Sequence, residues 1–335
     1  MTTSRRPGSP AAMASHHAFF CDSDAGCTAS LRTFLLEGLA AGEPALVAVP
    51  AGRLAPVRES VADSDLVSYL DMADLGRNPA RIIPAVREFT GAFPGRRTRF
   101  ASELIWAGRR PAETLEATRH ESLLNLAFEA VPVTMCCAYD TSSLPPAVLA
   151  DAARTHAYIR RADASEESAA YTGSALAHAI ASQPPPSPPG GADVVRFQRS
   201  DLRAVRGHVR ARAARAGLER DRAEDLMMAV NELATNTIIH SRAPGTLRTW
   251  QEPETGTLIC EVTGPGCIAD PLAGLHPPTA HLTGETGLWL VNQLCDLTDL
   301  HTGPWGTTIR LHMHAGTGRD PEDRHAGTGR GGAGR

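Results

Sequence analysis

The 335-residue chain contains no lysine, so each of its 33 basic residues is an arginine. This bias, together with 30 glycines and 25 prolines, is typical of a GC-rich genome, and a single arginine therefore carries little functional information. The formal net charge of −4 leaves no positive surplus of the kind that proteins use to bind the phosphates of nucleic acids. We expect no direct contact with nucleic acid.

Long apolar runs are also missing, and no segment approaches the roughly 20 apolar residues that a membrane-spanning helix needs. Residues 1–14 include two arginines but no apolar stretch of signal-peptide length. The seven cysteines are scattered and form no CxxC pair, so they indicate reduced, buried thiols rather than a zinc or redox motif. We expect a cytoplasmic protein that does not enter a membrane.

A proline-rich segment divides the chain. Residues 182–192 (SQPPPSPPGGA) cannot form a helix or a strand, and they predict an extended linker between domains at 15–181 and 193–313. Residues 314–335 repeat HAGTGR in a sequence rich in glycine and arginine, with too few apolar groups to offset the entropy of ordering. We expect residues 1–14 and 314–335 to be disordered.

The N-terminal region alternates short apolar runs with amphipathic segments, which predicts strands and helices in turn. Such alternation is typical of an α/β domain with a parallel sheet. The expected strands are 18–20, 44–49 and 131–138, and the expected helices are 29–40, 79–93, 111–130 and 146–158.

The C-terminal region predicts a different architecture, in which helices lie beside one mainly antiparallel sheet. This arrangement is an α+β sandwich. The expected helices are 201–216, 220–240 and 287–295, and the expected strands are 246–251, 257–262 and 307–312.

The clearest functional signal is the segment NELATNTIIH at residues 231–240, on the second of these helices. Glu232, Asn236 and His240 recur every four residues and therefore share one face of the helix. The amide oxygen of Asn236 suits Mg²⁺, which would bridge nucleotide phosphates, and Glu232 can accept a proton from an attacking hydroxyl or water. Taken alone, such a pattern is more often a solvated helix face.

Three glycine-containing segments follow in order and strengthen the functional interpretation. Val262–Gly266 is a tight turn after an apolar strand, Gly284–Gly287 precedes a helix, and Gly306–Thr308 opens the last strand. Glycines let the backbone approach phosphate oxygens, and a helix N-terminus offers free N–H groups and a favourable dipole. The sequence therefore predicts a nucleotide-binding site.

This order of segments resembles the GHKL ATPase family, and specifically its small anti-sigma-factor serine kinases, over residues 193–313. The resemblance implies ATP and Mg²⁺ as cofactors, with Glu232 as the catalytic base and Asn236 as the Mg²⁺ ligand. It also implies a homodimer whose partners are a sigma factor and a STAS-type antagonist protein, which is phosphorylated on a serine. The nucleotide-binding residues that it implies are Asn236, His240, Gly264, Gly266, Gly284, Gly287, Leu288 and Thr307.

One position departs from the family pattern. The family carries an aspartate two residues before Gly266, where it binds the adenine amino group, and this chain has Gly264 there. Loss of such a hydrogen bond costs about 1.5–3 kcal/mol, or roughly tenfold to a hundredfold in affinity. We expect Glu261 to face the other side of its strand and Asp270 to lie too far along the loop to replace it. The alternative to a kinase is therefore a non-catalytic binding module with weak or lost ATP binding.

Polar side chains of the N-terminal region form a second group of candidates. Segments 75–83 and 120–125 resemble the MEDS domain, a DcmR-like sensory module of RecA-like fold that is often fused to this type of kinase domain, over about residues 15–160. The resemblance implies that the region senses a small organic compound rather than performing catalysis. Strand ends are the usual ligand sites of open α/β sheets. The candidate residues for the sensed ligand are His17, Glu103, His120, Glu121, Tyr139 and Asp140.

Other interpretations of these residues stay open. His120 and Glu121 are more often a helix-packing pair than a metal site, because no third ligand has a compelling spacing. No Gly-Lys-Ser/Thr loop follows the first strand, which argues against a phosphate loop of the usual kind. A histidine-kinase fragment is a further alternative because the helix over 201–216 contains His208, but no long dimerising hairpin precedes the domain.

Overall fold

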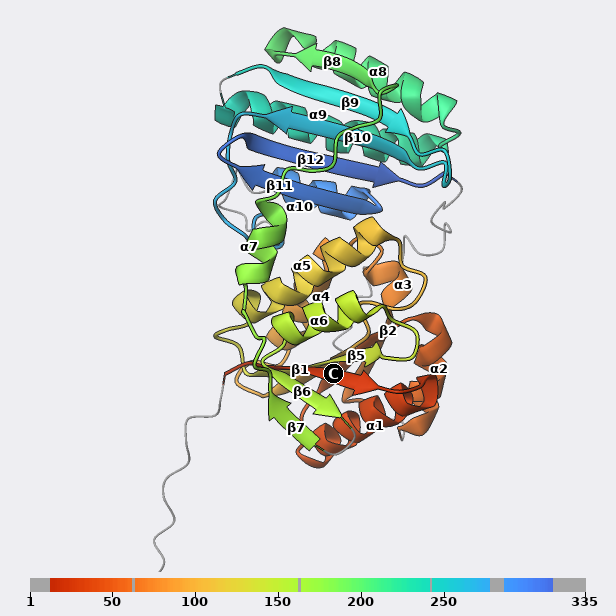
Figure 1. Ribbon diagram of the computed structural model, residues 1–335, viewed down its shortest axis with the longest axis vertical. Helices are drawn as coiled ribbons and strands as arrows, with labels where there is room; N and C mark the ends of the chain where they lie inside the picture. The colour runs from red at the N-terminus through yellow and green to blue at the C-terminus, as the bar shows by residue number, and fades with distance from the viewer. Residues whose placement is uncertain (1–12, 62–63, 162–163, 242, 278–285, 316–335) are drawn as a thin grey trace, which may run out of the picture.

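The computed structural model describes residues 13–61, 64–161, 164–241, 243–277 and 286–315. They form two regions, each built on its own sheet and stacked along the long axis of the molecule (Figure 1). Of the residues expected to be disordered, 1–14 and 314–335, most lie outside this described set, as does Gly284, whereas Ala14 packs against the core of the N-terminal region and the N–H of His314 donates to Asp296. No helix in the described part of the chain is long and apolar enough to cross a membrane.

The N-terminal region contains a seven-stranded sheet in the order β3-β2-β4-β5-β1-β6-β7. Neighbouring strands are parallel except at one edge, where β7 runs antiparallel to β6. The five residues of β2 are all buried, as expected for a central strand covered on both faces. The strands are β1 (Ser15–Cys21), β2 (Ala45–Val49), β3 (Val67–Asp71), β4 (Thr98–Ser102), β5 (Val133–Asp140), β6 (Tyr158–Arg161) and β7 (Ala164–Glu167).

Helices cover both faces of this sheet and create two separate cores. Successive residues of a strand point to opposite faces, so Ala18 lies in one core and Phe19 in the other. The core that contains Phe19 packs against α1 and α2, whereas the core that contains Ala18 packs against α4 and α5. The helices are α1 (Asp24–Ala40), α2 (Ala51–Ser60), α3 (Met72–Leu75), η1 (Pro79–Arg81), α4 (Ile82–Gly91), α5 (Pro111–Ala127), α6 (Pro146–Thr155) and α7 (Ala175–Ala181).

The C-terminal region is a five-stranded antiparallel sheet in the order β11-β12-β10-β9-β8, with α8, α9 and α10 on one face (Figure 1). The elements are β8 (Asp193–Phe197), η2 (Arg199–Asp201), α8 (Leu202–Arg215), α9 (Arg220–Ser241), β9 (Gly245–Gln251), β10 (Leu258–Gly264), α10 (Thr286–Leu294), β11 (Leu297–Gly303) and β12 (Gly306–Met313).

Hydrophobic periodicity explains how this second sheet and its helices meet. Leu226, Val230 and Leu233 lie on one face of α9 and are buried in the core between helix and sheet. On β10, Val262 enters the same core, whereas Glu261 lies on the opposite face and pairs with arginines of the neighbouring strands. Glu261 therefore faces away from the helices, as expected.

The predicted fold class is confirmed for both regions: an α/β sheet of mainly parallel strands, and an α+β antiparallel sheet with helices. Some elements lack a clear sequence signal, among them β3, β4, β8 and β11. β11 has no apolar run because it buries polar side chains, including Asp299 and His301. The helix predicted over 79–93 is also divided, since residues 79–81 form η1 and only 82–91 are α-helical.

The two regions meet where η1 reaches the C-terminal end of α10. The last carbonyls of a helix lack donors within that helix, and here side chains of the N-terminal region supply them. The buried Asn78 donates through Nδ2 to the carbonyls of Asn292 and Cys295, at 3.1 and 3.4 Å. Arg81 donates to the carbonyls of Asn292, Gln293 and Cys295 at 2.8–3.0 Å.

Charged and apolar contacts reinforce this junction. The buried carboxylate of Asp296 binds Arg222 of its own region at 2.5 Å and Arg77 of the N-terminal region at 3.4 Å. Leu275, from the loop after β10, is 2% exposed and packs into the core of the N-terminal region. The contact between the regions therefore combines helix capping, ion pairing and apolar burial.

The proline-rich residues 182–192, all of which the structure describes, form neither helix nor strand. They run across the face of the second sheet that is opposite its helices (Figure 1). His301 Nδ1 donates to the carbonyl of Gln183 at 2.8 Å, and Arg310 donates to the carbonyl of Pro186. The segment is thus attached to the sheet at two points.

We expect Asn78→Ala to lower the free energy of unfolding by about 1–3 kcal/mol, because its buried amide no longer donates to the carbonyls of Asn292 and Cys295 or to Thr298 Oγ1, and Arg81 alone still binds the two carbonyls. The isosteric Asn78→Asp should cost more, since it places a carboxylate against the same carbonyl oxygens. Chemical denaturation of the full chain measures both effects. Unchanged unfolding midpoints in both variants would contradict the importance given to this contact.

Candidate functional site

A pocket of about 320 Å³ opens between α9, the ends of β10 and β12, and α10. Its size lies within the range of roughly 300–1,000 Å³ that is usual for small-molecule sites. Most of its wall is apolar, with polar groups on one side. The lining residues are Leu233, Asn236, Thr237, His240, Ser241, Val262, Gly264, Gly266, Cys267, Ile268, Asp270, Ala273, Gly274, Leu288, Thr307 and Ile309.

Helix α9 supplies the polar side of this pocket. Asn236 is half-buried and His240 is exposed, and both line the pocket one turn apart. Glu232 is half-buried one turn before Asn236, next to the pocket rather than in its wall. The three residues therefore share the helix face that their spacing predicts.

The N-terminal end of α10 approaches these side chains directly. A Cβ atom on Gly287 would lie 2.5 Å from Asn236 Nδ2 and 3.4 Å from Glu232 Oε2, so a larger residue there would displace the side chain of Asn236. Free backbone N–H groups at a helix N-terminus favour anions. An amide, a carboxylate and a helix N-terminus thus meet at one edge of the pocket.

The ends of β10 and β12 form the pocket floor. Thr307 Oγ1 donates to the carbonyl of Gly266 at 2.7 Å and holds the turn after β10 against β12. Gly306 has φ +115°, and a Cβ atom there would meet the backbone of Gly264. The sequence-predicted residues Gly264, Gly266, Leu288 and Thr307 are therefore brought together, while Gly284 lies outside the described residues.

Gly264 is itself packed against α9. A Cβ atom at this position would collide with Thr237 Cγ2, so the methyl group of Thr237 fills the space of a larger side chain. The loop after β10 folds back, so that Asp270 lines the same pocket. Asp270 is exposed, and its carboxylate accepts a hydrogen bond from the N–H of Leu272. That Asp270 does not replace the aspartate of the family stays a prediction.

The candidates in the N-terminal region do not converge on one site. Glu103 binds Arg53 at 2.6 Å, and Asp140 accepts hydrogen bonds from Ser142. His17 stacks on a tyrosine of β6, with the ring centroids 4.9 Å apart. Each of these three side chains is engaged in a local structural contact.

The remaining candidates lie on α5 and β5. His120 Nδ1 donates to the carbonyl of Glu116 at 2.8 Å, which is a contact within α5. Tyr139 donates to Glu121 Oε1 at 3.0 Å, so these two candidates do meet. Glu121 also meets buried side chains that the sequence did not single out, because they come from three other elements.

Comparison with known protein families gives two matches. Residues 15–157 match MEDS, described as the MEthanogen/methylotroph, DcmR Sensory domain. Residues 195–313 match the histidine kinase-like ATPase domain, and this match implies ATP binding. No curated protein matches the chain.

Among solved structures, the RsbU and RsbW domains of a Mycobacterium tuberculosis protein are similar to 36% of this chain, at 18% sequence identity and a TM-score of 0.28. The chain spans 32% of the length of that structure. A similarity at this level supports no conclusion about this chain. The two family matches, by contrast, agree with the sheets and helices described above. The chain therefore joins a MEDS sensory domain at residues 15–157 to a histidine kinase-like ATPase domain at residues 195–313.

Proposed function

We propose that the ATPase domain is an ATP- and Mg²⁺-dependent protein serine kinase that acts as an anti-sigma factor under the control of the sensory domain. One observation carries the proposal. Asn236 and Glu232 converge on the backbone of Gly287, at the edge of an apolar pocket. A phosphoryl-transfer site needs such positioned groups more than it needs covalent chemistry.

The pocket residues fit ATP. The apolar side chains of Leu233, Val262 and Ile309 suit a nucleotide base, whereas the amide of Asn236 and the N-terminus of α10 suit phosphates and a divalent ion. When bound, the nucleotide supplies the transferable phosphoryl group and Mg²⁺ neutralises its charge. Asn236 would hold the ion through its amide oxygen, because a neutral oxygen ligand suits this hard cation.

Glu232 has the position of a general base. Its side chain lies beside the backbone of Gly287 and next to the pocket wall, where a hydroxyl group of a protein substrate could enter. A carboxylate at such a place accepts the proton of the attacking hydroxyl as the phosphorus–oxygen bond forms. The remaining residues bind and orient, so the chain needs no covalent intermediate.

The partners in this proposal come from the resemblance of the ATPase domain to anti-sigma-factor serine kinases. The substrate would be a serine on a STAS-type antagonist, and the competing partner would be a sigma factor bound by a homodimer of this chain. Because sigma factors act in the cytoplasm, the proposal also assigns the chain to that compartment.

The junction between the regions supports control by the sensory domain. Asn78 and Arg81 bind the C-terminal carbonyls of α10, and the N-terminal end of α10 borders the pocket at Gly287. A single nine-residue helix therefore contacts both the sensory domain and the nucleotide site. A ligand that shifts η1 would act on the pocket through this helix.

A second candidate function is a binding module that sequesters a partner without turnover. Gly264 favours it, since the position lacks the carboxylate that recognises adenine in the family, and Thr237 fills the space. The two candidates differ in whether the chain binds ATP and transfers its phosphoryl group. The three experiments below separate them.

The first experiment tests the metal ligand. We expect Asn236→Ala to weaken Mg²⁺-dependent ATP binding roughly tenfold to a hundredfold, because a ligand of the ion is lost. Isothermal titration of the full chain with ATP, with and without Mg²⁺, measures the effect. Asn231→Ala, on the same helix but bonded to Arg206, is the matched control and should bind as the wild type does. Equal affinity in wild type and Asn236→Ala would remove Asn236 from the site.

The second experiment tests the base. Glu232→Gln should keep ATP affinity but slow phosphorylation of a STAS-type antagonist about 100-fold or more, as loss of a general base does. Transfer from labelled ATP measures the rate, and Glu224→Gln, an exposed carboxylate on the same helix, is the control. Wild-type chain that binds ATP but transfers nothing to any antagonist would favour the binding module.

The third experiment concerns the pocket floor. Gly264→Asp alone should destabilise the domain by about 1–3 kcal/mol, because its Cβ collides with Thr237. The double variant Thr237→Ala/Gly264→Asp removes the collision and adds an acceptor for the base, so ATP affinity should rise roughly tenfold to a hundredfold. Titration with ATP and thermal unfolding measure both effects. No gain in the stable double variant would mean that Asp270 or another group already serves the base.

A further inference from the structure

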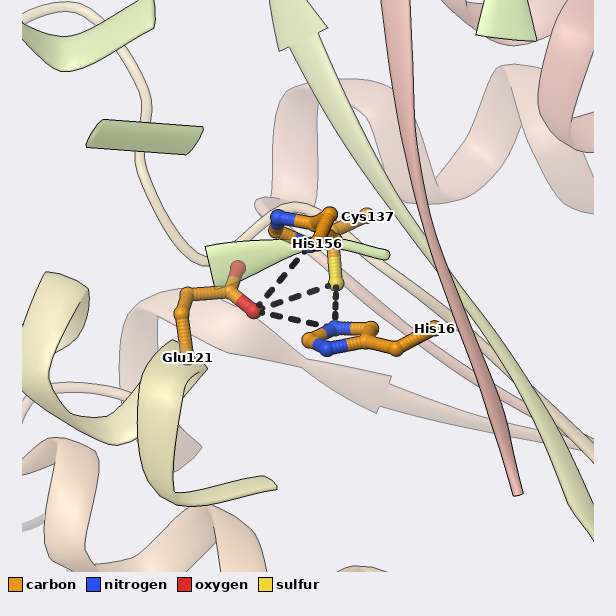
Figure 2. Close-up of side chains that lie close together, drawn as sticks. All are labelled: His16, Glu121, Cys137 and His156. Atoms are coloured by element: carbon orange, nitrogen blue, oxygen red, sulfur yellow. Dashed lines mark hydrogen bonds and ion pairs between the residues drawn. The ribbon is translucent and has the colours of Figure 1, made fainter. Parts of the chain in front are cut away.

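A group of four buried side chains lies between the sheet of the sensory domain and the helices on one of its faces (Figure 2). His16 comes from β1, Cys137 from the neighbouring β5, Glu121 from α5, and His156 follows α6 directly. None of the four side chains is more than 2% exposed. Segments far apart in the sequence therefore bring imidazole, thiol and carboxyl groups to one point that solvent does not reach.

The four donor atoms lie close enough together to bind one ion. Glu121 Oε2 lies 3.3 Å from His16 Nε2, 3.3 Å from Cys137 Sγ and 3.5 Å from His156 Nε2. His16 Nε2 lies 3.3 Å from Cys137 Sγ, and all four atoms lie within 4.8 Å of one another. Tetrahedral zinc with bonds of about 2.0–2.3 Å needs donor separations of roughly 3.3–3.8 Å.

Hydrogen bonds at Nδ1 fix the orientation of both imidazole rings, so that the lone pair of each Nε2 points toward the other three side chains. The Nδ2 of Asn125 donates to the carbonyl of Thr155 at 2.8 Å, so its Oδ1 is the atom that accepts from His16 Nδ1. His156 Nδ1 donates to the carbonyl of Ala152 at 2.8 Å. In both rings the proton is thus on Nδ1, and Nε2 is left as an acceptor. Metal-binding histidines are oriented by such second hydrogen bonds.

The other two groups are held in a similar way. Tyr139 donates to Glu121 Oε1 at 3.0 Å, which leaves Oε2 for the group. Ser102 Oγ donates to Cys137 Sγ at 3.2 Å and supports a thiolate there. Each of the four groups therefore has a partner outside the group and one donor atom inside it.

With Glu121 ionised, the four atoms include three acceptors that face one another, namely His16 Nε2, His156 Nε2 and the carboxylate, and the Cys137 thiol supplies one weak donor. Among the described residues, His156 Nε2 has no hydrogen-bond partner. A buried polar atom without a partner costs about 1–3 kcal/mol, and a cation at the centre would engage all four atoms at once.

The charges also balance. Both imidazoles are buried, and a neutral imidazole is the form that binds a metal ion. Burial raises the pKa of Glu121 and of Cys137. A divalent cation bound by a thiolate and a carboxylate has no net charge, which offsets the cost of burying each charge alone.

We propose that His16, Glu121, Cys137 and His156 form a closed site for one divalent transition-metal ion of the zinc class. The set of two imidazoles, one thiolate and one carboxylate suits zinc better than magnesium or calcium, which prefer oxygen ligands. Four protein ligands fill a tetrahedral ion, so the site is structural rather than catalytic. The ion ties α5 and the end of α6 to the sheet.

The first test is the metal content of the full chain, isolated without chelators and analysed by mass spectrometry. We expect about one equivalent of a first-row divalent metal per chain. After replacement by Co²⁺, the protein should show the intense visible bands of tetrahedral cobalt and a near-ultraviolet sulfur-to-cobalt charge-transfer band. Absence of stoichiometric metal, both as isolated and after reconstitution with Zn²⁺ or Co²⁺, overturns the proposal.

Cysteine variants show which thiol binds the ion. Cys137→Ser should abolish the charge-transfer band, whereas Cys136→Ser should retain it, because Cys136 is equally buried but lies in the core on the other face of the sheet. Cys267→Ser removes the exposed thiol and should also leave the band intact. A band that survives Cys137→Ser, or disappears in Cys267→Ser, refutes the assignment.

X-ray absorption of the wild-type zinc form gives an answer that does not depend on the folding of any variant. One sulfur near 2.3 Å and three nitrogen or oxygen ligands at about 2.0–2.2 Å are expected. A first shell with no sulfur, or with more than one, refutes the four-residue set. This test is independent of the kinase proposal, since it involves no residue of the ATPase domain.

Discussion

The arrangement of the two domains depends on the hydrogen bonds that Asn78 and Arg81 donate to the C-terminal carbonyls of α10. Those carbonyls have no donors within their own helix, so side chains of the sensory domain supply the hydrogen bonds that cap α10. The opposite end of α10 carries Gly287, which lies against Asn236 and Glu232. A short helix is therefore held by the sensory domain at one end and borders the pocket of the ATPase domain at the other.

Helix α5 of the sensory domain, like α10 of the ATPase domain, takes part in two separate contacts. It contributes Glu121 to the buried four-residue group, and it also packs against β11 of the ATPase domain. Glu116 and Arg119, five and two residues before Glu121, are buried as an ion pair. An ion held by Glu121 would thus fix the position of the same helix that contacts the second sheet. Helix α5 therefore connects the buried four-residue group to the contact between the two domains.

Local patterns in the sequence predicted the fold class and the helix face that Glu232, Asn236 and His240 share, because both depend on periodicity. Glu232, Asn236 and His240 share a face since they repeat every helical turn, and the glycines mark backbone turns. The contribution of Asp270 and the grouping of His16, Cys137 and His156 around Glu121 were not predictable. They depend on how a loop returns and on which strands become neighbours, and no short-range pattern carries that information. Residue His16, rather than the adjacent His17, faces Glu121 because successive strand residues point to opposite faces.

The attachment of residues 182–192 to the second sheet has a consequence for how the protein is assembled. Arg310 both pairs with Glu261 and holds the carbonyl of Pro186, and His301 holds the carbonyl of Gln183. The chain that joins the domains is therefore part of the surface of the second one, and its length does not set the distance between them. A partner protein that approached this face of the sheet would meet residues 182–192 where they cross β11 and β12.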